Sequence, residues 1–233
     1  MKRGSAAVTR VRVVEHVHSK LRKMIVSGKY PPGAVLSQVQ LANMLGVSRT
    51  PLREAMRRLE AEGLIDAEQN QRARVATDDA DGLDVVFTER ILLEAMGIKV
   101  TIPKLTEIDL NGLLASATAL RLAAEAGNVA SLDKARRAFH RQLVSRAGRR
   151  LREKIAEQFD RCERHRKVWT PLENGDFETY AAISGACVAR DAHEAIRQVA
   201  RLETALARRT LFALQPRFEP VAIGVALQML DHA

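Results

Sequence analysis

The 233-residue sequence has little of several features that would place it in other protein classes. Its two cysteines, Cys162 and Cys187, are too few for a disulfide framework or for a zinc module built from cysteines alone. No apolar run reaches about 18 residues, so a membrane-spanning helix is not expected. The basic start of the chain lacks the apolar stretch of a secretory signal, which makes the cytoplasm the expected location.

Signals of catalysis are also missing. The sequence has no glycine-rich phosphate loop and no recognisable nucleophile motif, and single histidines on helices are usually structural. An enzyme in the C-terminal region is kept as an alternative, with the candidate residues His140, Cys162, His165, Cys187 and His193. Aromatic residues make up only 4% of the chain, so the core of that region is expected to consist of Leu, Ala, Ile and Val.

What the sequence does have is positive charge, and it is concentrated at one end. Residues 1–76 hold 14 Lys/Arg against 6 Asp/Glu, a net charge of +8, whereas the remaining 23 and 22 leave +1. Neutralising phosphates with basic side chains releases counterions, so the excess favours a polyanion partner for the first third. A basic surface without a partner is the alternative that charge alone leaves open.

The pattern of the first third predicts a small DNA-binding domain over residues 11–77. Apolar residues at steps of three and four, with Gly and Ser at the ends, predict helices over 11–27, 38–45 and 49–62. Residues 64–76 resemble a strand, a polar turn and a second strand, which would form a β-hairpin wing. Charged and small residues over 1–10 are typical of a disordered arm.

An acidic, polar linker over 78–82 separates this domain from an all-helical bundle over 83–233. The helical period predicts seven helices there, over 83–99, 106–127, 131–147, 149–168, 176–189, 191–213 and 220–231. Thr106 and Asp191 resemble the first residues of capping boxes. The predicted fold class is therefore mainly α, with an N-terminal winged helix-turn-helix.

The two short helices joined by a tight turn have the layout of a helix-turn-helix, in which the second helix reads the major groove. Ser48 is expected to cap that helix. Arg49 and Arg53 lie one turn apart on one face, where arginine can bond to guanine or to a phosphate. Thr50 adds a hydroxyl and a methyl group. The predicted DNA-binding set is Ser48, Arg49, Thr50, Arg53 and, from the wing, Arg72 and Arg74.

Residues 17–76 resemble the DNA-binding domain of the GntR family of bacterial regulators. The resemblance rests on Leu21-Arg22, Ile25, Leu41-Ala42 and the segments GKYPPG (28–33), LGVSRTPLREA (45–55) and LEAEGL (59–64). It implies that Arg49, Thr50 and Arg53 contact operator DNA. The chain departs from the family at Gln38, where glutamate is usual, and at Arg72, where the wing tip usually has glycine.

Residues 83–214 resemble the FCD effector-binding domain of the FadR-type branch of this family. The matching fragments are Arg90 with Leu93-Glu94, FHRQL (139–143), Ala182-Ile183 and ARDA (189–192). Many members of this branch bind a divalent metal through one aspartate and three histidines. Here the aspartate position is Arg136, His140 stands at the first histidine, and Tyr180 and Leu202 stand at the other two. A guanidinium does not ligate a metal, so no metal is expected at this site.

One hypothesis for the sensor is that Arg136 binds an anionic effector directly. His140 and Tyr180 would then supply hydrogen bonds, and the resemblance adds Arg90 as a further pocket candidate. In the alternative, the pocket has degenerated, Arg136 is exposed or paired with an acid, and His140 is a core residue. The overall prediction is a ligand-responsive repressor that binds a palindromic operator as a homodimer and takes a small organic anion. A DNA-binding regulator without an effector is the main alternative.

Overall fold

The computed structural model describes residues 3–68, 72–169 and 176–231. The chain divides into two compact units. The first unit comprises Met1–Asp79 and Asp160–Val168, and the second comprises Ala80–Phe159 and Trp169–Ala233. None of the described helices is long and apolar enough to cross a membrane.

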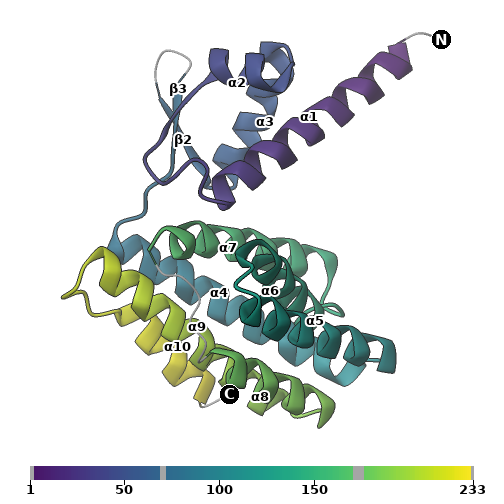
Figure 1. Ribbon diagram of the computed structural model, residues 1–233, viewed down its shortest axis with the longest axis vertical. Coiled ribbons are helices and arrows are strands. Elements are labelled where there is room, and N and C mark those ends of the chain that lie inside the picture. Colours follow the sequence, from purple (N-terminus) through teal and green to yellow (C-terminus); the bar gives the residue numbers. More distant parts are fainter. Residues whose placement is uncertain (1–2, 69–71, 170–175, 232–233) are drawn as a thin grey trace. The chain divides into compact units, whose positions relative to one another are not determined.

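The first unit is a winged helix-turn-helix (Figure 1). Its elements are α1 (Arg3–Val26), β1 (Val35–Ser37), α2 (Gln38–Leu45), α3 (Arg49–Ala61), β2 (Ile65–Glu68) and β3 (Arg72–Val75). The strands form an antiparallel sheet in the order β1-β3-β2. The apolar faces of the helices meet in one core with the inner side chains of the sheet, including Leu21, Ile25, Leu52, Leu59 and Val75. The apolar residues whose spacing predicted the helices therefore form the core of this unit.

The ends of α2 and α3 follow the sequence prediction only in part. The Ser37 hydroxyl accepts a hydrogen bond from the Gln40 amide at 3.5 Å at the start of α2. Gly46 ends α2 in the left-handed conformation (φ 66°), where glycine carries no Cβ penalty. Ser48 precedes α3 in an extended conformation but makes no side-chain capping hydrogen bond, so the prediction that its side chain caps this helix was wrong. This short connection sets the direction of α3 relative to α2.

Two features of the first unit differ from the sequence prediction. The first helix begins at Arg3, so the part of the expected disordered arm that the structure describes is helical. Ala6 and Ala7 are strong helix formers, and extending an existing helix adds one hydrogen bond per residue. The strand β1 was not predicted, because three residues give no readable alternation and their partners in β3, such as Arg74 opposite Val35, are distant in sequence.

The second unit is an all-helical bundle. Its elements are α4 (Ala80–Thr101), the 3₁₀-helix η1 (Ile102–Lys104), α5 (Glu107–Glu125), α6 (Val129–Leu143), α7 (Arg149–Trp169), α8 (Asp176–Val188), α9 (Ala192–Leu214) and α10 (Val221–Asp231). The helix α4 packs along α9 and α10, and α5 pairs with α6 (Figure 1). The core is built from Leu, Ala, Ile and Val with few aromatic residues, as expected. The predicted mainly helical fold class is confirmed.

The helix starts in this unit follow the predicted caps. At α5 the Asp109 amide donates to the Thr106 hydroxyl at 3.3 Å, and the Thr106 amide donates to the Asp109 carboxylate at 2.8 Å. At α9 the Glu194 amide donates to the Asp191 carboxylate at 2.8 Å. The predicted linker over 78–82 is shorter in the structure, because α4 begins at Ala80.

Candidate functional site

The outer face of α3 is a basic surface. Arg49, Thr50 and Arg53 are exposed in the first two turns of the helix. Its other face is buried in the core through Leu52 and Leu59. Because the apolar face is fixed, the two arginines project from the unit at the end of the helix that a helix-turn-helix inserts into the major groove. The structure thus brings the sequence-predicted recognition residues together on one exposed face.

Arg57 extends this surface and was missed by the sequence analysis. It is exposed and lies four residues after Arg53, so positions 49, 53 and 57 form one row along α3. The same spacing that was used to pair Arg49 with Arg53 was sufficient to find it. Arg58 is also exposed, but it lies about 180° around the helix from Arg49 at 100° per residue.

The wing carries the other two predicted DNA contacts. Arg72 and Arg74 both lie on β3 and are exposed. One guanidinium nitrogen of Arg74 donates to the Gly33 carbonyl at 2.8 Å, so this side chain also fixes the loop that precedes β1. The predicted turn at the wing tip includes residues 69–71, which lie outside the described residues. Arg72 is also a predicted wing contact. Its side chain is exposed, and the bond to Gly33 belongs to Arg74.

A second set of charged groups in the first unit surrounds Asp78. Its carboxylate accepts from Arg161 at 3.3 Å and from Arg164 at 3.1 Å, and His165 Nε2 lies 3.0 Å from it. Arg164 also donates to the Leu64 carbonyl at 3.1 Å. Burial opposes ionisation of Asp78, but the bond to His165 and the positive charges outweigh it and hold its pKa below the usual value. These contacts tie residues 160–168 of α7 to the base of the wing.

The second unit contains a buried network of charges. Arg90 donates to Glu203 at 2.8 Å and to Glu94 at 3.3 Å. Arg136 donates to the Tyr180 hydroxyl at 2.9 Å and to Glu203 at 3.3 Å. Both arginines and both glutamates are at most 1% exposed. Two guanidinium groups and two carboxylates thus compensate each other inside the bundle.

His140 lies at the edge of this network. Its Nδ1 is 3.2 Å from Glu94, and its Nε2 has no hydrogen-bond partner, with Glu203 at 3.5 Å. Burial would raise the pKa of Glu94, but His140 and Arg90 outweigh it and hold that pKa well below the ordinary value. Burial raises the pKa of Tyr180, so its hydroxyl stays protonated. The anion beside Arg136 is therefore a carboxylate of the chain itself.

The pairing of Arg136 with Glu203 disagrees with the hypothesis that Arg136 binds an external anion directly. The four predicted effector residues do gather in one place, since Arg90, Arg136, His140 and Tyr180 all belong to the network or border it. Arg136 is nevertheless 0% exposed and paired with Glu203. The pairing matches the alternative in which Arg136 meets an acid. The sequence analysis missed it because Glu203 is 67 residues away.

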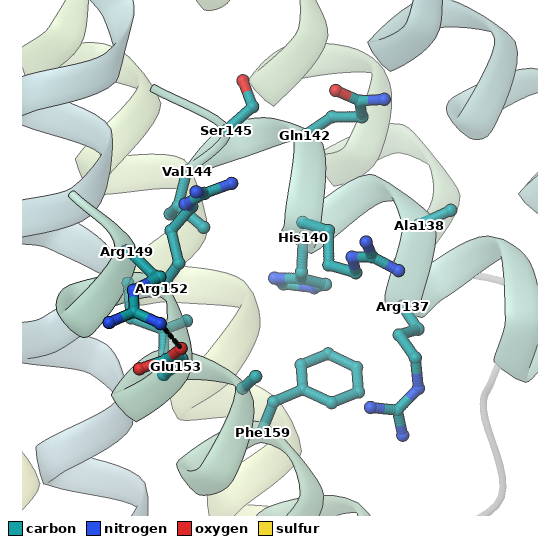
Figure 2. A pocket seen from close by; sticks show the side chains of 13 residues that line it. Arg137, Ala138, His140, Gln142, Val144, Ser145, Arg149, Arg152, Glu153 and Phe159 are labelled. Atoms are coloured by element: carbon teal, nitrogen blue, oxygen red, sulfur yellow. Dashed lines mark ion pairs between the residues drawn. The ribbon is translucent and has the colours of Figure 1, made fainter. Parts of the chain in front are cut away.

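A cavity of about 640 Å³ opens on the other side of His140, between α6 and α7 (Figure 2). Its apolar wall includes Val144, Ile155 and Phe159, and the Phe159 ring lies 5.3 Å from the His140 ring. A Cβ at Gly97 would lie 2.7 Å from Val144 and 2.9 Å from Ile155, so glycine allows α4 to support this wall closely. Arginines border the cavity on both helices: Arg137, Arg141, Arg149 and Arg152.

Comparison with known proteins decides which family these two units represent. Residues 13–75 match the bacterial regulatory proteins of the gntR family, and residues 85–205, more than half of the chain, match the FCD domain. The chain belongs to the GntR family and carries an FCD domain. This GntR-family regulator has DNA as its partner, as the basic face of α3 predicted, and it is not an enzyme.

The relatives of this GntR-family chain are described as transcriptional regulators. McbR of Escherichia coli is 27% identical over 183 residues, which cover 78% of this chain and 79% of McbR. The solved E. coli McbR/YncC structure matches with a TM-score of 0.76 at 25% identity, covering 83% of this chain and 94% of that one.

Two further relatives match over shorter stretches. The uncharacterized HTH-type regulator YdhC of Bacillus subtilis is 37% identical over 93 residues, which cover 40% of this chain and 42% of YdhC. A probable D-xylose utilization operon repressor of Paenarthrobacter nicotinovorans is 33% identical over 95 residues, or 41% of this chain and 38% of the repressor. The chain therefore aligns with less than half of the length of either of these relatives.

The metal that many FCD domains hold does not fit the residues of this GntR-family chain. Among the described residues, Glu94, His140 and Glu203 place potential ligand atoms within 4.8 Å of one another. The guanidinium groups of Arg90 and Arg136, however, already bond to these two carboxylates. A divalent cation there would displace those bonds and lie beside two positive charges.

Proposed function

We propose that this regulator is a ligand-responsive repressor that binds a palindromic operator as a homodimer. The observation that carries the proposal is the exposed row of Arg49, Thr50 and Arg53 at the start of α3, with the wing arginines on the same unit. One recognition helix gives too little affinity to be specific, so two copies spaced by about one helical turn of DNA are expected. The relative described as a D-xylose utilization repressor supports repression over activation.

We further propose a small organic anion as the effector, with no metal required and with the cytoplasm as the site of action. The arginines around the α6–α7 cavity support an anion, and the arginine-filled position of the family metal supports independence from metal. If this is right, a chelator changes neither thermal stability nor effector binding. A chelator that lowers the melting temperature, with recovery on adding Zn²⁺ or Ni²⁺, would contradict the metal-free proposal.

The DNA side is tested by selecting preferred sequences from random duplexes with the purified full chain. Inverted repeats with half-site centres about 10 base pairs apart are the expected result, with two chains per duplex by sedimentation. The matched variant pair is Arg49→Ala and Arg58→Ala, since each removes one exposed arginine from α3. Selected sites without symmetry, or one chain per duplex, would contradict the dimeric arrangement.

A DNA-binding regulator whose sensor takes no effector is a second candidate. It is favoured by one observation, the pairing of Arg136 with Glu203 inside the bundle, because Arg136 is then already bonded to a carboxylate of the chain. The two candidates differ in one measurement, the operator affinity across a panel of organic anions. A change in affinity with any anion supports the ligand-responsive repressor, and a constant affinity supports the second candidate.

A further inference from the structure

The lining of the α6–α7 cavity carries an excess of positive charge. Four arginines and one acidic residue, Glu153, are among the described residues around it, a net charge of +3 from these five side chains. Glu153 neutralises little of this positive charge, because its carboxylate is 3.9 Å from Arg149 and both side chains are largely exposed (Figure 2). A concave surface lined by one sign of charge concentrates ions of the opposite sign.

The inner part of the same cavity is apolar and aromatic. Phe159 is 4% exposed, and its ring faces the Arg137 guanidinium at 4.9 Å. His140, 2% exposed, also lines the cavity, and its ring nitrogens lie 3.2 Å from Glu94 and 3.5 Å from Glu203 of the buried network. Figure 2 shows His140 and Phe159 together at one side, with Arg149 and Arg152 across from them on α7. Charged groups thus surround an apolar and aromatic interior.

We infer that the α6–α7 cavity is the effector site and that it takes an organic anion with at least two negative charges on an apolar or aromatic carbon body. The inference rests on the proposed ligand-responsive function and specifies its ligand class. Arginine binds carboxylates and phosphates in a bidentate manner, and the arginines lie on two different helices, so they suit separate anionic groups. A cavity of about 640 Å³ has the size of an ordinary small-molecule site.

The two halves of α7 give this site a connection to the DNA-binding unit. Residues 149–159 line the cavity, and residues 160–168 of the same helix belong to the first unit, where Arg164 bonds to Asp78. An effector that clamps Arg149 and Arg152 acts on a helix whose other end is bound to the base of the wing. Differential affinity for two positions of α7 would shift the balance between them.

The experiment titrates the full chain with phthalate, an aromatic dianion, and follows binding by calorimetry. Benzoate has the ring with one charge, and citrate has three charges without an apolar body. Phthalate is expected to bind in a saturable manner and about tenfold or more tighter than either control, a difference of about 1.4 kcal/mol. The Arg149→Gln/Arg152→Gln variant is expected to lose this binding, and the control Arg150→Gln, which removes one neighbouring charge that does not line the cavity, is expected to keep it.

Unchanged phthalate affinity in the double variant would overturn the site, and so would the absence of binding up to ~10 mM, a weak-affinity limit. Citrate binding as tightly as phthalate would overturn the apolar part of the ligand class. If the double variant does not fold, Arg141→Gln provides a second test. Arg141 is an exposed arginine of the same cavity and lies on α6.

Operator affinity is measured separately in the same samples. Phthalate that binds in the cavity but leaves operator affinity unchanged supports the site and contradicts the ligand-responsive function. Intact operator binding with no cavity ligand overturns the inference and leaves the DNA-binding regulator standing.

Discussion

Two sets of arginines in this molecule have opposite environments. On α3, Arg49 and Arg53 are exposed and face outward, whereas in the bundle Arg90 and Arg136 are at most 1% exposed and bonded to Glu94 and Glu203. The sequence already indicates this difference, since the first third has a net charge of +8 and the remainder has a net charge of only +1. An arginine is available for an external anion when the fold does not place an acid beside it.

The largest effect is expected from breaking the buried network. Arg136→Ala should lower the free energy of unfolding of the second unit by about 3–5 kcal/mol, because it leaves Glu203 buried with less compensation. Urea unfolding followed by circular dichroism measures this. The exposed pair of Arg121 and Glu125 provides the control, since Arg121→Ala should change stability by less than ~1 kcal/mol. Equal stability of the two variants would show that burial does not separate the two kinds of arginine.

The next effect concerns the exposed arginines. Arg49→Ala should weaken operator binding by about 1–3 kcal/mol, or roughly 5- to 150-fold, without changing the melting temperature. Fluorescence anisotropy with a selected operator measures the affinity. Arg58→Ala removes the same charge from another side of α3 and should have a smaller effect. If both variants bind equally well, general charge and not the position on α3 determines affinity.

A third, smaller effect is a pH dependence of the buried network. The pKa of Glu94 is lowered in the folded chain, since the charges of His140 and Arg90 outweigh the effect of burial. Its contribution to stability is therefore present above pH 4.5 and is lost as the pH falls toward the lowered value. The slope for one such group is at most about 1.4 kcal/mol per pH unit. Glu94→Gln should reduce this slope, and the exposed Glu125→Gln should leave it unchanged; equal slopes would refute the assignment.

The smallest effect is expected at the wing. Arg72→Ala should lower operator affinity about equally for all sequences and reduce the dependence of log K on log salt by about one, as for a single phosphate contact. Titrations at several salt concentrations measure the slope. A change in sequence preference would instead mean that Arg72 reads bases.

The sequence predicted most elements because their signals are local. The apolar spacing placed α2 and α3 to within a residue, and Thr106 and Asp191 correctly marked the starts of α5 and α9. In contrast, β1 is a strand because it pairs with β3, and no sequence pattern near residues 35–37 predicts a strand there. Local capping and periodicity are visible in one sequence, whereas pairing between distant segments is not.

The same limit explains the outcome for the sensor. Arg90, Arg136, His140 and Tyr180 were correctly grouped through the family resemblance, but their charge state depends on Glu203, which no local pattern connects to them. The α6–α7 cavity was also not predicted. Its arginines resemble those of any solvated helix, and only the packing of α6 against α7 shows that they surround a concavity.

The division of α7 between the two units has a practical consequence for building chimeric regulators. A segment ending at Asp79 contains every predicted DNA contact but lacks residues 160–168. In such a transplant, the Leu64 carbonyl and the Asp78 carboxylate lose the guanidinium of Arg164. A DNA-binding head exchanged between relatives therefore has to bring the second half of α7 with it, or be fused to a host helix that offers an arginine at the same position.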